Sequence, residues 1–103
     1  MNEASSEASD DRYILTLYVA GQSSKSLAAF SNLKRICEEH LEGRYSIEIV
    51  DVLRFPEQAI EHQIVALPTL IRKVPKPMRK IIGDLSNKEK SLVAMDIRPD
   101  PKT

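Results

Sequence analysis

Reactive side chains are scattered along this 103-residue chain instead of forming a catalytic motif. Asp51 and Asp84 follow apolar runs, where carboxylates serve acid–base chemistry or, more often, cap turns, and no nucleophile or base accompanies them. His40 and His62 have no second ligand at metal spacing, which favours surface or helix-end histidines over a metal site. Only three dispersed glycines are present, so a phosphate-binding glycine loop is absent. The sequence predicts a protein that is not an enzyme and holds no metal or cofactor.

Basic side chains gather in the stretch Leu67–Asp84, where two short apolar runs are separated by prolines. Strand-like runs bounded by Pro and Gly predict a β-hairpin. Its turn region carries five basic residues and no acid: Arg72, Lys73, Lys76, Arg79 and Lys80. Such a turn is either a solvated surface or a contact for phosphates or for an acidic protein. Because no aromatic residues lie nearby, an acidic protein surface fits better than nucleic acid.

Composition places the chain in an ordinary class. Fifteen basic and fifteen acidic residues balance, so no overall charge draws it to nucleic acid or to a membrane. The length fits one domain, and no apolar run approaches the ~18 residues of a membrane helix. Cys37 is the only cysteine, which favours a reducing compartment. The acidic N-terminal residues do not resemble a signal peptide, so we expect a cytoplasmic protein.

The N-terminal half shows the clearest periodicity. Residues 1–11 predict a flexible acidic tail, and the domain is expected over residues 12–97, before a second flexible tail at 98–103. The apolar run 13–20 predicts a strand buried on both faces, and 45–53 predicts a second strand. Between them a helix is expected over residues 26–42. Its core stripe would be Leu27, Phe30, Leu33, Ile36, Cys37 and Leu41.

The C-terminal half predicts a short helix after Pro56, then the hairpin, then a helix from Asn87 to about Asp96 behind a Ser86–Glu89 capping box. The sum, β-α-β-α-β-β-α, is a thioredoxin-like α/β fold. Redox members of that fold carry a Cys-x-x-Cys after the first strand. This chain has Gly21-Gln22-Ser23-Ser24 there, and Cys37 lies in the helix stripe, so we expect no thiol catalysis.

Two segments do not commit to one structure. In Ser91–Ile97, Leu92 and Met95 suit a helix face, whereas Val93, Met95 and Ile97 suit one face of a strand. Pro75–Leu85 reads either as half a hairpin or as a helix that begins at Pro77. Short apolar runs often fit both a helix and a strand simply because they are short. The alternative is that two packings compete within a few kcal/mol, as in fold-switching proteins.

Four stretches of the chain resemble the KaiB family of circadian clock proteins. They are YILTLYVAG at 13–21, IVDVL at 49–53, LPTL at 67–70 and RKIIGDLS at 79–86, with Lys88-Glu89-Lys90 behind the last. Membership would imply a non-enzymatic adaptor that binds the hexameric ATPase KaiC and alters its phosphorylation state. It would also imply possible competition with a sensor histidine kinase. Family members have two folds: a homotetrameric resting state, β-α-β-β-α-α-β, and a thioredoxin-like monomer that binds KaiC.

The resemblance also implies site residues. Partner binding would fall on strand two, the ends of strand one and the basic hairpin: Tyr13, Tyr45, Glu48, Gln63, Arg72, Lys73, Arg79 and Lys80. Refolding would involve Pro68, Pro75, Pro77, Gly83, Ala94 and Asp96. A homotetramer, or a dimer, is expected at rest, with neither nucleic acid nor membrane as a partner. An alternative is a thioredoxin-fold interaction module in stress signalling that is not coupled to an oscillator.

Three departures from the cyanobacterial pattern bear on these expectations. The motif Gly-Leu-Asp is Ala94-Met95-Asp96 here, and Ala is better than Gly in a helix by about 0.8–1 kcal/mol. This favours the thioredoxin-like state, whereas the family precedent favours the tetramer. Glu48 replaces a usual lysine, and Ala28 replaces a basic residue. Both positions lie on or near the partner surface in the family.

Overall fold

A four-stranded sheet forms the centre of the computed structural model, which describes residues 12–97. Its strands are β1 (Tyr13–Val19), β2 (Tyr45–Asp51), β3 (Thr69–Val74) and β4 (Arg79–Ile82). They lie in the order β2-β1-β3-β4, so β2 and β4 are the edges. β2 runs parallel to β1, and the β3–β4 hairpin is antiparallel to its neighbours. The two expected tails lie outside the described residues.

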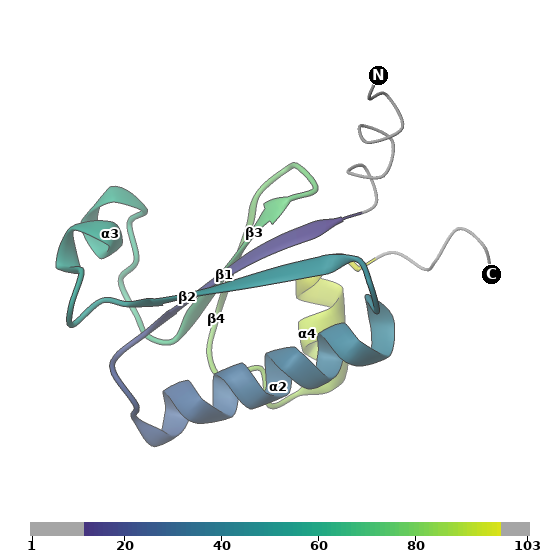
Figure 1. Cartoon of the computed structure of the whole chain (residues 1–103), viewed down its shortest axis with the longest axis horizontal. Helices are drawn as coiled ribbons and strands as arrows, with labels where there is room; N and C mark the ends of the chain where they lie inside the picture. The colour runs from purple at the N-terminus through teal and green to yellow at the C-terminus, as the bar shows by residue number, and fades with distance from the viewer. Residues whose placement is uncertain (1–11, 98–103) are drawn as a thin grey trace.

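Three helices surround this sheet: α2 (Ser24–His40), α3 (Pro56–Glu61) and α4 (Lys88–Met95). Figure 1 shows α2 and α4 on one side of the sheet. α3 lies past one end of the sheet, toward its opposite side. The predicted order β-α-β-α-β-β-α is confirmed, and the arrangement is the thioredoxin-like one, not the alternative β-α-β-β-α-α-β. No helix within residues 12–97 is long and apolar enough to cross a membrane.

The two faces of β1 build two cores. Leu15, Leu17 and Val19 pack under α2 and α4 against a cluster that includes Leu33 and Met95. On the opposite face a smaller cluster joins Tyr18, Val50, Val52 and Ile71, with Ala59 and Ile64 from the α3 region packed on it. β1 is therefore buried on both sides, as predicted, apart from Ile14, which is 41% exposed.

The predicted core stripe of α2 is partly wrong. Leu33, Ile36 and Cys37 are buried as expected, but Leu27 and Phe30 are 56% and 42% exposed. Ser26 and Ala29 are buried in their place. The reason is that β2 ends the sheet, so one flank of the first turns of α2 faces solvent. Ser23 caps this helix by accepting a hydrogen bond from the Ser26 amide.

The start of α4 also differs from its prediction. Asn87, not Ser86, is the N-cap, and its side chain accepts a hydrogen bond from the Lys90 amide at 3.0 Å. The amide of Ser86 instead donates to Asp84 Oδ1 at 3.1 Å, so the chain is still turning there. The capping box is wrong by one residue, while the helix itself is confirmed.

Two leucines of α2 provide a test of this packing. Leu33 is fully buried, so Leu33→Ala removes core contacts and should lower the free energy of unfolding by about 2–5 kcal/mol. The same truncation at the exposed Leu27 should change it by no more than about 0.5 kcal/mol. Urea unfolding followed by circular dichroism measures both values. Equal losses in the two variants would contradict this orientation of α2.

Candidate interaction surface and switch region

β2 presents an open sheet edge, since no strand within residues 12–97 pairs with its outer side. Its side chains alternate, and Ser46, Glu48 and Ile49 are exposed. Glu48 pairs with Thr16, on the face that α2 and α4 leave uncovered. A strand edge of this kind offers backbone hydrogen bonds to another chain. The structure thus leaves Glu48 accessible to a partner.

The two tyrosines proposed for partner binding differ from one another. Tyr45 is partly exposed at the start of β2, and its hydroxyl donates a hydrogen bond to Glu38 of α2. That bond to a carboxylate raises the pKa of Tyr45 to about 12. Tyr13 is only 4% exposed and belongs to the main core, with the Arg44 guanidinium 5.9 Å from its ring centre. Filling the core edge is therefore the role of Tyr13 in this structure, and it offers little surface to a partner.

The basic hairpin lies mostly on strands. Lys73 is in β3, Arg79 and Lys80 are in β4, and only Lys76 occupies the turn. Lys80 Nζ donates to the backbone oxygens of His62 at 3.2 Å and Gln63 at 3.0 Å. The hairpin is thereby tied to the segment after α3. Lys80 and Gln63 are exposed and lie together at the β4 edge, whereas Arg79, the preceding residue of the strand, points to the opposite face of the sheet.

Arg72 is not part of that surface. The sequence placed it in an exposed turn, but it is 1% exposed and is among the largest buried side chains. It lies on the inner face of β3, opposite Leu15 in β1, which is the face that α4 covers. Expecting Arg72 to contact a partner is therefore wrong for this arrangement of the chain.

Arg72 instead joins three parts of the C-terminal third. Its Nη1 donates to the backbone oxygens of Met95 at 2.6 Å and Asp96 at 3.3 Å, and its Nη2 donates to Pro77 O at 2.7 Å. The Asp96 carboxylate lies 4.0 Å from Arg72 Nη1 and 3.5 Å from Arg79 Nη2. The last carbonyls of a helix have no partner within it, and a cation there also favours the helix dipole. The guanidinium thus caps α4 from within the fold.

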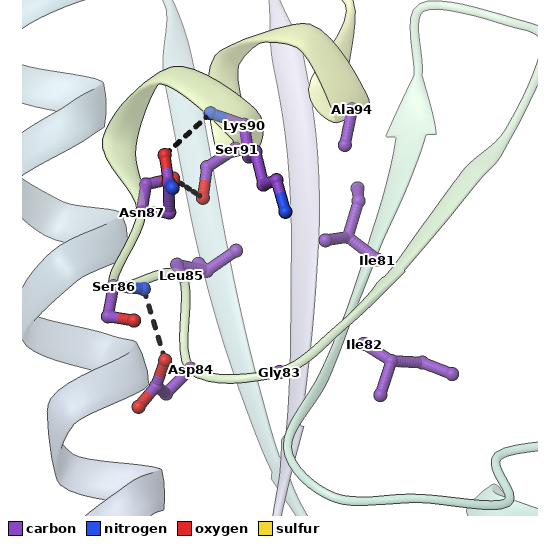
Figure 2. A pocket seen from close by; sticks show the side chains of 10 residues that line it. All are labelled: Ile81, Ile82, Gly83, Asp84, Leu85, Ser86, Asn87, Lys90, Ser91 and Ala94. Atoms are coloured by element: carbon purple, nitrogen blue, oxygen red, sulfur yellow. Dashed lines mark hydrogen bonds between the residues drawn. The ribbon is translucent and has the colours of Figure 1, made fainter.

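Gly83 and Ala94, two of the residues predicted for refolding, lie at the junction of β4 and α4. A cavity of about 230 Å³ lies there, lined by residues that include Ile81, Gly83, Lys90 and Ala94. Figure 2 shows the Ala94 side chain directed toward Ile81. It also shows two hydrogen bonds, from the Ser86 amide to Asp84 and from the Lys90 amide to Asn87. Gly83 has a φ of +121°, a backbone conformation that residues other than glycine rarely adopt.

The three prolines assigned to the switch occupy different environments. Pro68 is buried, and its backbone oxygen accepts a hydrogen bond from Gly83 at 2.9 Å. Pro75 is half-buried in the turn, and Pro77 is exposed. All three follow cis peptide bonds. The backbone oxygens of Pro68 and Pro77 thus accept hydrogen bonds from the Gly83 amide and the Arg72 guanidinium, respectively.

Reactive candidates occupy structural positions. Cys37 is fully buried, as predicted, and burial raises the pKa of its thiol to about 12. Asp51 Oδ1 accepts from the amides of Gly21 at 2.9 Å and Leu53 at 3.0 Å, which is the expected turn-capping role. The ring of His62 lies 5.8 Å from that of Tyr18. No group of three or more metal-ligating side chains occurs within residues 12–97.

An apolar surface beside β2 was missed by the sequence reasoning. Leu27, Phe30 and Ile49 are each more than 40% exposed and line a cavity of about 240 Å³ with Gly21 and Gln22. The helical spacing of Leu27 and Phe30 is the signal in the sequence. It predicts core positions, because the sequence does not show that β2 is an edge strand.

Comparison with known proteins identifies the family. The family model described as KaiB domain matches residues 16–97. This chain belongs to the KaiB family. It is 47% identical over 90 residues to the circadian clock protein KaiB3 of Synechocystis sp., covering 87% of this chain and 88% of that protein. It is 48% identical over 85 residues to the circadian clock oscillator protein KaiB of Microcystis aeruginosa, covering 82% of each.

Solved structures agree on the fold of this KaiB homologue. The N-terminal domain of Synechococcus elongatus SasA superposes with a TM-score of 0.68 at 19% identity, covering 81% of this chain and 80% of that domain. Chloroplastic thioredoxin z has the same TM-score at 20% identity, covering 94% and 90%. The thioredoxin-like fold predicted from the sequence is thus confirmed. The family supports a clock-type protein-interaction role, and the names of the relatives above state no reaction.

The Arg72 contacts lead to a prediction about α4. Arg72→Gln should leave buried carbonyls without their donor and lower the free energy of unfolding by about 1–3 kcal/mol. Hydrogen exchange should accelerate first at the amides of α4. Arg79→Gln removes an exposed ion pair to the same Asp96, so it should cost only about 0–1 kcal/mol. Exchange in α4 that is no faster in the Arg72 variant than in the Arg79 variant would contradict the capping role.

Proposed function

We propose that this KaiB homologue is a non-enzymatic, clock-type adaptor that binds a KaiC-like hexameric ATPase and modulates its phosphorylation or ATPase state. The observation that carries the proposal is the match of the KaiB domain to residues 16–97, nearly the whole described chain. The open β2 edge with Glu48 and the exposed basic hairpin with Lys80 support it, since both offer polar contacts to another protein. A sensor histidine kinase as a competing partner belongs to the same proposal.

Switching between a tetrameric resting fold and the present fold is the second part of the proposal. The C-terminal third is the region that supports it. α4 buries only Ser91 and Met95, and three of the four residues of β4 are exposed. Segments with little buried apolar surface open at low free-energy cost. Residues 75–97 are also the stretch whose sequence fits two structures.

Native mass spectrometry tests the partner. The chain is measured alone, then with the KaiC-like ATPase of its own organism and ATP. We expect a hexameric ring carrying about one copy of this chain per subunit. Absence of a complex at tens of micromolar over hours would reject the clock function and leave an interaction module for another partner, such as one in stress signalling.

A substitution at Glu48 should change the affinity for the ATPase in a predictable direction. The family usually has a lysine at this exposed position, so the partner surface that meets it should be acidic. Glu48→Lys should therefore tighten binding about 1.4- to fivefold, the equivalent of the ~0.2–1 kcal/mol of an exposed ion pair. Glu57→Lys, on exposed α3, makes the same charge change away from β2 and serves as the control. Equal effects of both substitutions would place the contact elsewhere.

Ala94 tests the switch independently of the partner. Ala94 lies inside α4, so Ala94→Gly should disfavour the thioredoxin-like state by about 0.8–1 kcal/mol per subunit. Because four subunits associate together, the ratio of tetramer to monomer subunits should rise by at least about fourfold. Ala28→Gly is the matched control, because the α2 segment is helical in both proposed folds. Native mass spectrometry at one concentration measures the ratio. An unchanged ratio, or the same rise in both variants, would argue against a switch centred on α4.

A further inference from the structure

The charge of this chain is divided unevenly along the sequence. Four of the fifteen acidic residues, Glu3, Glu7, Asp10 and Asp11, lie in residues 1–11, which contain no Lys or Arg. The other residues therefore hold eleven acids and all fifteen basic residues, an excess of four positive charges. The near-zero net charge of the whole chain results from an acidic segment that balances a basic domain.

The fold places the start of the described domain, to which that segment is joined, beside the basic hairpin. β1 is an inner strand, and Ile14 near its start pairs with Val74 at the end of β3. Lys73 directly precedes Val74, and Lys76 follows in the turn. Adjacent strands are about 4.8 Å apart, so residues before Arg12 leave the domain within one or two strand spacings of these lysines.

Three lysines of the basic hairpin have no carboxylate partner of their own. Lys73, Lys76 and Lys80 form no ion pair within residues 12–97, whereas Arg79 pairs with Asp96 and Lys88 with Glu39. Lys80 donates only to backbone oxygens. Three like charges on one hairpin favour an acidic occupant.

We propose that residues 1–11 dock on the surface formed by Lys73, Lys76 and Lys80 and cover it in the free protein. Eleven residues span at most about 36–40 Å when extended, which is ample for this distance. A covalently attached segment also meets its site at a high effective concentration, so weak individual ion pairs suffice. The docked segment imitates an acidic partner surface and must leave before that partner binds.

Paramagnetic relaxation tests the docking without any partner. A nitroxide is attached to Ser5→Cys, and Cys37 stays unlabelled because it is fully buried and its thiol pKa is raised to about 12. At low salt, amide signals from Lys73 to Lys80 should lose intensity more than those of α2. The loss should disappear near 0.5 M salt, where the screening length falls to about 4 Å.

Matched variants assign the effect to charge. Replacing the four acids (Glu3→Gln, Glu7→Gln, Asp10→Asn and Asp11→Asn) should abolish the loss of hairpin signals, and so should Lys73→Gln with Lys76→Gln. Lys25→Gln with Lys34→Gln removes two exposed charges from α2 and should leave it unchanged. Signal loss centred on Arg44, or spread evenly over the domain, would overturn the proposal. So would loss in a ¹⁵N-labelled chain mixed with a separate spin-labelled chain, because docking would then be intermolecular.

The competition with a partner rests on the proposed function, but the docking does not. If residues 1–11 cover the hairpin, the chain with four neutralised acids should bind the KaiC-like ATPase faster than the natural chain at low salt. Docking without any ATPase complex would reject the proposed function and keep the intramolecular contact. An ATPase complex without site-selective signal loss would keep the function and reject the docking.

Discussion

The buried guanidinium of Arg72 is the constraint on which the C-terminal third depends. A cation that is 1% exposed requires nearby acceptors, since an unpaired charge in the interior costs several kcal/mol. Its acceptors are Met95 O, Asp96 O and Pro77 O, which belong to the end of α4 and to the hairpin turn. Where α4 ends and how the turn folds back are therefore set by one side chain of β3.

Stability is divided unevenly by this arrangement. β1, α2 and β2 share a continuous apolar core in which Leu15, Leu17 and Leu33 are fully buried. α4 contributes one fully buried apolar side chain, Met95, and the partly buried Leu92. Polar contacts such as that of Lys88 with Glu39 at 2.6 Å add to these. Polar contacts at the surface are weak, so α4 should separate from the sheet at a low free-energy cost. The proposed second packing would need such a loosely held segment beside a well-packed core.

The sequence revealed the elements better than their surroundings. Periodicity together with the positions of Pro and Gly predicted the observed order of elements, although residues 75–85 and 91–97 also fitted a second structure. The family motifs agreed with the fold. Exposure was harder, because it depends on sheet order, which no local pattern contains. Leu27 and Phe30 seemed to be core residues until β2 proved to be an edge, and Arg72 seemed to be exposed until its face of β3 proved to be covered by α4. Long-range packing, not local propensity, decided both positions.

Arg72 also determines what any second packing must provide. If residues 91–97 left the helix to form a strand, the carbonyls of Met95 and Asp96 would enter new hydrogen bonds and Arg72 would lose them. The guanidinium would then need solvent or other acceptors, at a cost that a neutral side chain would not carry. Ala94 acts in the same direction, because its helix propensity is lost with α4. Both residues favour the thioredoxin-like packing. A tetramer of this chain must therefore recover, through contacts between subunits, what Arg72 and Ala94 contribute within one.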